Sequence, residues 1–440
     1  ETRVMDRSSA CAWCVLLGLG ILLRIPSCRG LYLPPRASCA PPKTRAVIQP
    51  VEEPPTMEEE LTDPESHKKI RRRSIARVDK PPRLPVWPVV TGLVCTALDL
   101  LSLKDQAAWV EDVFGGRVAP MMLDAELADP FVLLVHHRHA FAPWDPVRPL
   151  FRLLIAEGFP AHPHVGFETV TMTLRGGLKH RDSFGVAETY ADGDVQWLTA
   201  GRGVLHEEMW HGAQCELYQL WLNLPRAHKG ADPRTVVLRA EDTNEDVDHT
   251  EDETATGGGR VRNLFDLGGS LNIFTEKDKT PGRRRARAGP GRPDVRLMRL
   301  ELEPGATFSA TVPADATVLA YCRKGRVAIG DDVLERHALA YTTKGAEALV
   351  IEGTSSEGTS DVLLLCGEPL REPVVASGTW VVSSERELEL ADRAYRAGRL
   401  GWPWDHELSD ADWREWVAQY PPAAPDSAVA AAAADPPRSS

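Results

Sequence analysis

Cysteine is scarce in the part of the chain that can fold, and this excludes a scaffold built on disulfides. Four of the eight cysteines lie in the first forty residues. The others are widely separated: Cys95, Cys215, Cys322 and Cys366. Nothing in this spacing demands a disulfide, and a reducing cellular interior fits it.

Long apolar runs and an excess of basic residues are also missing. The apolar run at residues 11–23 is shorter than the roughly 20 residues that a membrane-spanning helix needs, so no membrane span is expected. A formal net charge of -12 argues against direct nucleic-acid binding, because phosphate neutralisation needs a basic surface. Any link to DNA would therefore run through a protein partner. The remaining composition, 43% hydrophobic and 26% charged over 440 residues, is that of a soluble protein with room for two domains and tails.

The N-terminal hundred residues resemble targeting and linker sequence. Met5-Asp6-Arg7 before the apolar run resembles a signal peptide, and residues 24–50 contain five basic residues and no acid. Residues 1–50 are therefore a candidate signal plus plastid transit segment. The alternative is an extension that is not genuine, with the protein in the cytoplasm or nucleus. Residues 51–107, with acid clusters, a basic run at 68–73 and prolines, are predicted to be a largely disordered linker.

Two short motifs predict one metal site. In a β-strand, residues two apart point to the same face, so His162 and His164 share a face, as do His206 and Glu208. If the two segments lie side by side, three imidazoles and one carboxylate converge and leave roughly two positions open on a six-coordinate ion. Such a set suits a mononuclear first-row metal. Non-haem iron, Fe(2+), is the leading candidate, and copper, nickel or manganese are the alternatives. The competing interpretation is that these are ordinary core or surface histidines.

The residues around these motifs are typical of a barrel. Val170 and Met172 alternate with Thr169, Thr171 and Thr173, which is the pattern of a half-buried strand. Glycine and aspartate turns separate this run from further short alternating runs. Several short strands joined in this way indicate a β-barrel or jelly roll.

Several longer motifs resemble those of a known family. The segments 162–171, 179–183, 196–203 and 206–209 resemble the N-terminal domain of pirin, a member of the cupin superfamily. Residues 367–374 resemble the signature of the pirin C-terminal domain. The resemblance implies a mainly β fold of two cupin β-barrels, a bicupin. It also implies iron in the first barrel, held by the residues that match His162, His164, His206 and Glu208.

The resemblance for the two cupin domains, and composition and periodicity for the other segments, predict the following organisation. Residues 108–235 form the metal-binding N-terminal cupin, and 236–290 form an insertion with acidic and basic loops and strands between them. Residues 291–380 form a C-terminal cupin without metal, in which His337 stands alone, and which buries one face of the first barrel. Residues 381–420 form C-terminal helices, the first with a capping box at Ser384 and Glu387. Residues 421–440 are a disordered tail.

Other polar residues near the motifs have less certain roles. His136, His137 and His139 are predicted to be structural or to line the rim of the site. Glu168 is expected to support a metal ligand from behind. His180 and Asp182 either orient a ligand, line the entrance or are turn residues. The family usually has arginine where this chain has Val165, which alters the charge at the entrance.

Two functions are consistent with such a site. In the first, the protein is a quercetin 2,3-dioxygenase-like oxidoreductase that uses Fe(2+), O₂ and a flavonol-like substrate, with Glu208 as catalytic base as well as ligand. In the second, the iron is a redox sensor, and a protein partner in transcriptional co-regulation reads its state. The sensor requires an exposed partner surface, for which Val165 and the nearby loops are the candidates. A monomer is expected in either case.

Overall fold

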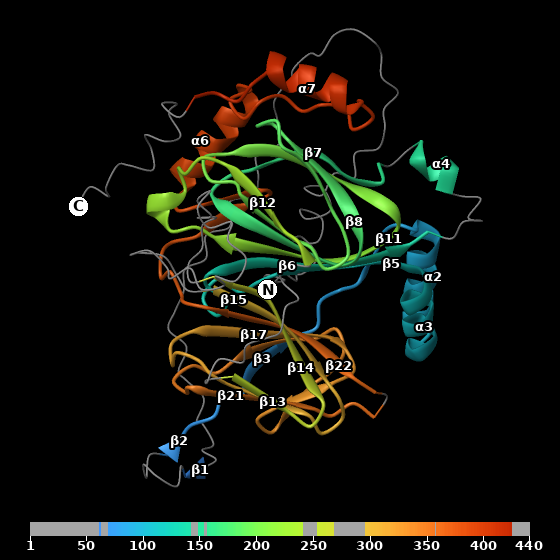
Figure 1. Ribbon diagram of the computed structural model, residues 1–440, viewed down its shortest axis with the longest axis vertical. Helices are drawn as coiled ribbons and strands as arrows, with labels where there is room; N and C mark the ends of the chain where they lie inside the picture. Colours follow the sequence, from blue (N-terminus) through green and yellow to red (C-terminus); the bar gives the residue numbers. More distant parts are fainter. Residues whose placement is uncertain are drawn as a thin grey trace, which may run out of the picture.

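The computed structural model describes residues 61–62, 69–141, 148–153, 156–240, 253–267, 295–356 and 358–424. The described chain is mainly β and forms two barrels stacked along the long axis of the molecule (Figure 1). The fold prediction of two cupin barrels with C-terminal helices is thus confirmed. The candidate targeting segment 1–50, the acidic block 241–252 and the basic block 268–294 lie outside the described residues, as does the tail from 425.

The first barrel is built on one nine-stranded sheet. Its strands are hydrogen-bonded in the order β12-β10-β8-β11-β6-β5-β4, with β7 also on β11 and β9 also on β8. The strand bounds are β4 (Leu84–Pro85), β5 (Gly115–Met122), β6 (Phe131–Ala140), β7 (Gly158–His164), β8 (Phe167–Asp182), β9 (Ala187–Tyr190), β10 (Val195–Thr199), β11 (Val204–Asn223) and β12 (Arg234–Leu238). The central strand β11 pairs with β6, β7 and β8, so residues along it contact most of the barrel.

The second barrel consists of two sheets. Their strand orders are β13-β16-β21-β18-β19 and β14-β15-β22-β17-β20-β3. The bounds are β3 (Ile75–Asp79), β13 (Glu253–Thr256), β14 (Gly259–Leu267), β15 (Val295–Leu302), β16 (Thr307–Thr311), β17 (Thr317–Lys324), β18 (Val327–Ile329), β19 (Asp332–Leu334), β20 (Leu339–Thr342), β21 (Ala348–Gly353) and β22 (Ser360–Gly367). The strands expected within the 236–290 insertion therefore belong to the second barrel.

The prediction of a disordered linker over residues 51–107 is wrong for its described part. Strand β3, blue in Figure 1, pairs with β20 among the orange strands of the second barrel. Arg73, from the basic run, is 1% exposed and donates hydrogen bonds to the carbonyl oxygens of Ala316, Ala346 and Pro313. Local charge suggested a solvated segment, but backbone acceptors elsewhere in the fold bury this cation.

Helices also occupy the predicted linker. Helices α2 (Val89–Leu100) and α3 (Lys104–Phe114) pack on each other beside β4 and β5, so the fold begins well before residue 108. Shorter elements are β1 (Leu61–Thr62), β2 (Lys69–Ile70), α4 (Arg148–Arg152) and the 3₁₀ turn η1 (Arg226–His228). No helix among the described residues is long and apolar enough to span a membrane.

One apolar cluster joins the two barrels. From the first barrel it takes residues such as Leu134, Val170 and Met172, and from the second Leu297 and Leu365, all buried. On β8, the residues of this cluster alternate with threonines that face the interior of the first barrel. The second barrel thus buries one face of the first, as predicted.

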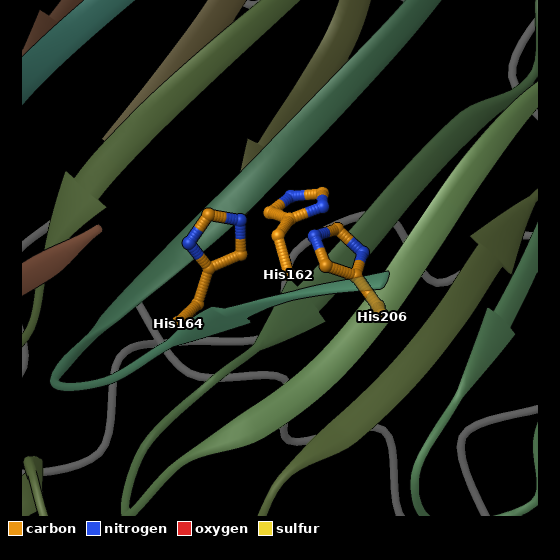
Figure 2. A group of neighbouring side chains, drawn as sticks. All are labelled: His162, His164 and His206. Atoms are coloured by element: carbon orange, nitrogen blue, oxygen red, sulfur yellow. The ribbon is translucent and has the colours of Figure 1, made fainter. Parts of the chain in front are cut away.

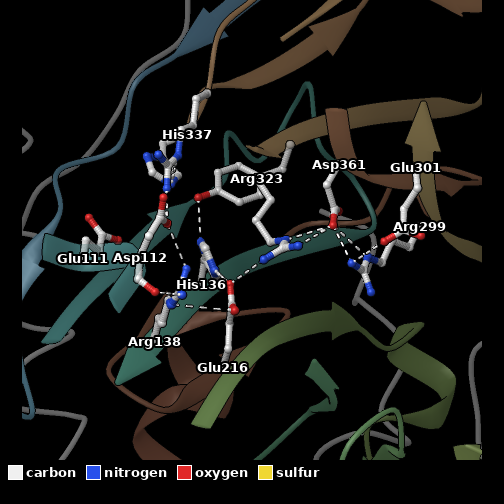
Figure 3. Close-up of polar contacts among 12 residues, drawn as sticks. Glu111, Asp112, His136, Arg138, Glu216, Arg299, Glu301, Arg323, His337 and Asp361 are labelled. Carbon is white, nitrogen blue, oxygen red and sulfur yellow. Dashed lines mark hydrogen bonds and ion pairs between the residues drawn. The ribbon is translucent and has the colours of Figure 1, made fainter. Parts of the chain in front are cut away.

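A chain of buried ion pairs crosses the same interface (Figure 3). Glu216 on β11 lies 3.0 Å from the His136 ring and 2.9 Å from Arg323 of β17. Asp361 of β22 then accepts hydrogen bonds from Arg323 (3.1 Å) and from Arg299 of β15 (3.0 Å). The polar residues of this interface therefore form one network that links the two barrels.

The C-terminal segment covers the end of the first barrel (Figure 1). It contains β23 (Val375–Ser377), β24 (Trp380–Val382), α6 (Glu385–Arg396) and α7 (Asp410–Gln419). Half of the predicted capping box is present, because Ser384 accepts from the Glu387 N–H, while the Glu387 carboxylate accepts from the N–H of Ser383, one residue before the cap. The amide of Val381 donates to the carbonyl of Val165, which joins this segment to the end of β7.

Candidate metal centre

Three histidines from two neighbouring strands converge in the first barrel (Figure 2). Strands β7 and β11 are antiparallel, and their register places His162 opposite His206 and His164 opposite Val204. One ring nitrogen from each histidine lies within 4.8 Å of those of the other two. The ring centroids are 4.4 to 4.8 Å apart. The predicted meeting of the two segments is therefore observed for the three imidazoles.

The ring nitrogens of His164 and His206 have no hydrogen-bond partner among the described residues. His206 is 0% exposed and His164 is 1% exposed, yet neither nitrogen of either ring makes a hydrogen bond within the described residues. The Thr379 backbone lies near His164 without reaching hydrogen-bond geometry. Unsatisfied buried polar groups are costly and rare, so four such atoms in one place call for a ligand. A cation bound between the rings would take one nitrogen from each ring, and the donor set fits a first-row metal.

The tautomer of the third histidine is set by the backbone. His162 is partly exposed, and its Nδ1 lies 2.8 Å from the carbonyl oxygen of Pro160, to which it donates. Its Nε2 is therefore left with a free lone pair, which is the arrangement that ligating histidines commonly show.

Burial keeps all three imidazoles neutral. It lowers the pKa of His162, and it lowers the pKa of His164 and His206 well below the ordinary value of 6.5. The neighbouring rings lower the pKa of His164 and His206 further. Since a histidine must be neutral to bind a metal, the site is in its binding form at neutral pH.

Glu208 lies beside this group but outside the set of mutually close ligand atoms. It is 1% exposed, and its carboxylate accepts hydrogen bonds from three side chains. Thr171 and Tyr190 donate to Oε1 at 3.1 and 2.6 Å, and Gln219 donates to Oε2 at 2.7 Å. The predicted fourth ligand is thus buried near the histidines, and its coordination of a metal stays a prediction.

Comparisons with known proteins identify the family. The Pirin family matches residues 116–222, and the family described as the pirin C-terminal cupin domain matches residues 297–401. Pirin-1 of Arabidopsis thaliana is 31% identical over 283 residues, which cover 63% of this chain and 86% of that protein. The chain belongs to the pirin family. Human pirin is 32% identical over 255 residues, covering 56% of this chain and 78% of that protein.

A solved structure agrees with this assignment. The quercetin 2,3-dioxygenase from Acinetobacter baumannii is 26% identical and superimposes with a TM-score of 0.50, covering 64% of this chain and 91% of that one. The Pirin match contains all four candidate ligands. The pirin fold therefore accounts for both barrels.

In this pirin, Val165 is not at an exposed entrance. It is 3% exposed and packs in a cluster with Leu205, Ala391, Leu400 and Trp404 beneath the C-terminal helices. The expectation that Val165 alters the charge at the entrance, or forms an exposed partner surface, is therefore wrong. A valine is compatible here because the C-terminal segment covers the position with apolar side chains.

Glu168 also differs from its prediction. It lies on β8 at odd spacing from Thr171, so it faces away from Glu208, and Thr199 donates to it at 2.7 Å.

His180 and Asp182 are buried and lie 3.3 Å apart, with the His180 ring 5.4 Å from that of His206. Asp182 also accepts from the amides of the following turn, so it combines a turn role with a position behind the site.

The histidines of β6 serve packing roles. His136 faces the second barrel, where its Nδ1 lies 2.9 Å from the Tyr321 hydroxyl. His137 bonds to His139 at 2.8 Å and stacks on Trp210 with ring centroids 4.6 Å apart. Among the described residues, the metal-type cluster comprises only the three histidines above. No local motif marks Tyr190, Gln219 or Trp210 as site residues.

Lys229 joins three segments behind the site. Its ammonium donates to the carbonyls of Gly166 and Val381 and to the side chain of Asn223. Burial lowers the pKa of Lys229 to about 7, from an ordinary 10.5. Between these two values the unfolded chain binds a proton that the folded chain does not, so stability rises as the pH rises.

We expect Lys229→Met to remove this pH dependence. From pH 7 to 10, the wild-type free energy of unfolding should gain up to about 1.4 kcal/mol per pH unit relative to the variant. Urea denaturation at a series of pH values measures the difference. If the free energy of unfolding depends on pH in the same way in both proteins, Lys229 does not have a lowered pKa in the folded state.

Proposed function

We propose that this pirin holds Fe(2+) on His162, His164, His206 and Glu208 and oxidises a flavonol-like substrate with O₂. The observation that carries the proposal is the set of four buried imidazole nitrogens without protein partners. Similarity to a solved quercetin 2,3-dioxygenase supports the choice of reaction. When bound, Fe(2+) would supply a Lewis acid with open positions for an enolic oxygen and for O₂.

The protein residues at the site have distinct tasks in this reaction. The three neutral imidazoles bind the metal without adding charge, and Glu208 contributes one negative charge. Glu208 is also the candidate base for the substrate hydroxyl, since its carboxylate is buried beside the histidines and is held in place by neutral donors.

An aromatic substrate is supported by the residues next to the histidines. A shift in the β7–β11 register places Phe159 opposite Glu208, so the bulge turns this ring toward the inside of the barrel. Phe159 and Trp210 are both partly exposed and meet edge to face with centroids 5.1 Å apart. Such rings favour a planar aromatic partner beside the partly exposed His162.

Oxygen consumption tests the proposal. Purified protein is first analysed for its metal, then loaded anaerobically with Fe(2+) and mixed with quercetin in air-saturated buffer. We expect O₂ uptake with loss of the flavonol absorbance, and no uptake by His162→Ala. His211→Ala is the matched control, because His211 is exposed on the same strand as His206. Absence of turnover across a panel of flavonols would overturn the dioxygenase proposal.

The sensor alternative has less support. It needs an exposed patch that a protein partner could read, and Val165, which is buried under the C-terminal helices, does not contribute to such a patch.

A further inference from the structure

The two oxygens of the Glu208 carboxylate have unequal surroundings. Oε1 accepts two hydrogen bonds, from Thr171 and Tyr190, whereas Oε2 accepts one, from Gln219. An ionised carboxylate has about two lone-pair sites on each oxygen. Oε1 is therefore saturated by protein donors, and Oε2 keeps one site for another partner.

Tyr190 makes the shorter of the two contacts to Oε1. It is 0% exposed on β9, and its hydroxyl also lies 3.3 Å from Oε1 of Gln196. With its amide as assigned, Gln196 leaves its buried Nε2 without a partner. The reverse amide orientation exchanges oxygen and nitrogen, so that Gln196 donates to Tyr190 while Tyr190 donates to Glu208. This orientation gives the Gln196 nitrogen a partner and aims the Tyr190 proton at the carboxylate.

We propose that Tyr190 is a positioning residue that occupies Oε1 of Glu208 and so reserves Oε2 for the metal. The inference rests on the proposed function in one respect, namely that a metal occupies the histidine site. A carboxylate held in this way offers a single oxygen, which keeps a coordination position open for substrate.

Cobalt(II) binding to Tyr190→Phe tests the inference without requiring turnover. The variant removes only the hydroxyl, and we expect the Co(II) affinity to fall by about 10- to 100-fold, the usual cost of losing a residue that orients a ligand. The visible absorption of bound Co(II) should change as well, because the carboxylate is free to rotate. Tyr218→Phe is the control, since its buried hydroxyl has no hydrogen-bond partner. Thr171→Val, which removes the other donor to Oε1, is the second test variant.

The same measurement in a Glu208→Ala background separates positioning from general stability. There Tyr190→Phe should have no further effect on affinity or spectrum. An undiminished effect in that background, or an unchanged spectrum and affinity in Tyr190→Phe alone, would overturn the inference. So would a wild-type protein that binds no Co(II), which would also remove the metal site. If the Co(II) affinities and spectra change as expected but the Fe(2+)-loaded protein consumes no flavonol, the inference stands and only the dioxygenase reaction is overturned.

Discussion

His206→Ala is expected to abolish metal binding at micromolar metal while leaving the barrel folded. The two ring nitrogens of the wild-type His206 make no hydrogen bond within the described residues. Removing them therefore leaves no protein donor or acceptor there unpaired. Loss of a direct ligand should lower the affinity by more than the roughly 10- to 100-fold that loss of a supporting residue costs. Metal content after dialysis and isothermal titration measure this change.

The thermal transition provides a second measure for the same variant. A metal that binds only the folded state raises the melting temperature, so Co(II) should stabilise the wild type and His211→Ala but not His206→Ala. If His206→Ala retains both the metal and its stabilisation, the three histidines do not form the site. Circular dichroism of the metal-free proteins shows whether the fold is preserved.

Asp361→Ala is expected to produce a large loss of stability. Asp361 is 3% exposed and pairs with both Arg299 and Arg323, so its removal leaves two largely buried guanidinium groups without this partner. Breaking a buried pair in this way typically costs about 3–5 kcal/mol. Urea denaturation of the metal-free protein at pH 7 measures the difference from wild type.

An exposed pair serves as the control for this variant. Asp315 and Arg371 also form an ion pair, but their side chains are 62% and 60% exposed. Asp315→Ala should therefore cost less than about 1 kcal/mol. If Asp361→Ala and Asp315→Ala lower the free energy of unfolding by similar amounts, the interface ion pairs do not act as a buried network.

The effect of Asp361→Ala should also depend on pH. Burial alone would raise the pKa of Asp361, but Arg323 and Arg299 outweigh it, so the pKa lies below its ordinary 3.8. A carboxyl group whose pKa is lowered by folding contributes stability above its unfolded value and loses that stability as the pH falls through the folded value. The difference between wild type and variant should accordingly shrink below about pH 4.

The alternation of side chains predicted correctly which residues share a face within one strand, but it did not predict this across a turn. His162 and His164 lie on β7, and His206 and Glu208 lie on β11, so the spacing of two residues placed each pair correctly. Glu168 follows His164 by only four residues, but the turn at Val165-Gly166 begins a new strand. The side-chain alternation restarts there, and Glu168 faces away from the histidines.

Residues that depend on distant contacts could not be predicted from local sequence. Arg73 belongs to a basic run that suggested a solvated linker, and only the carbonyl groups of the second barrel, some 240 residues later, explain its burial. Tyr190 reaches Glu208 because β9 folds back on β8, which in turn pairs with β11. Neither contact leaves a signature in the neighbouring residues.

The sequence by itself determined the candidate ligands, their pairing on two strands and the family, because these depend on short spacings and motifs. The tertiary structure alone decided that the imidazoles converge, which oxygen of Glu208 remains available and that Val165 is covered. The physical reason is that alternation fixes a side chain's face within its own strand, whereas its neighbours are set by the register between strands. That register depends on the packing of the whole barrel.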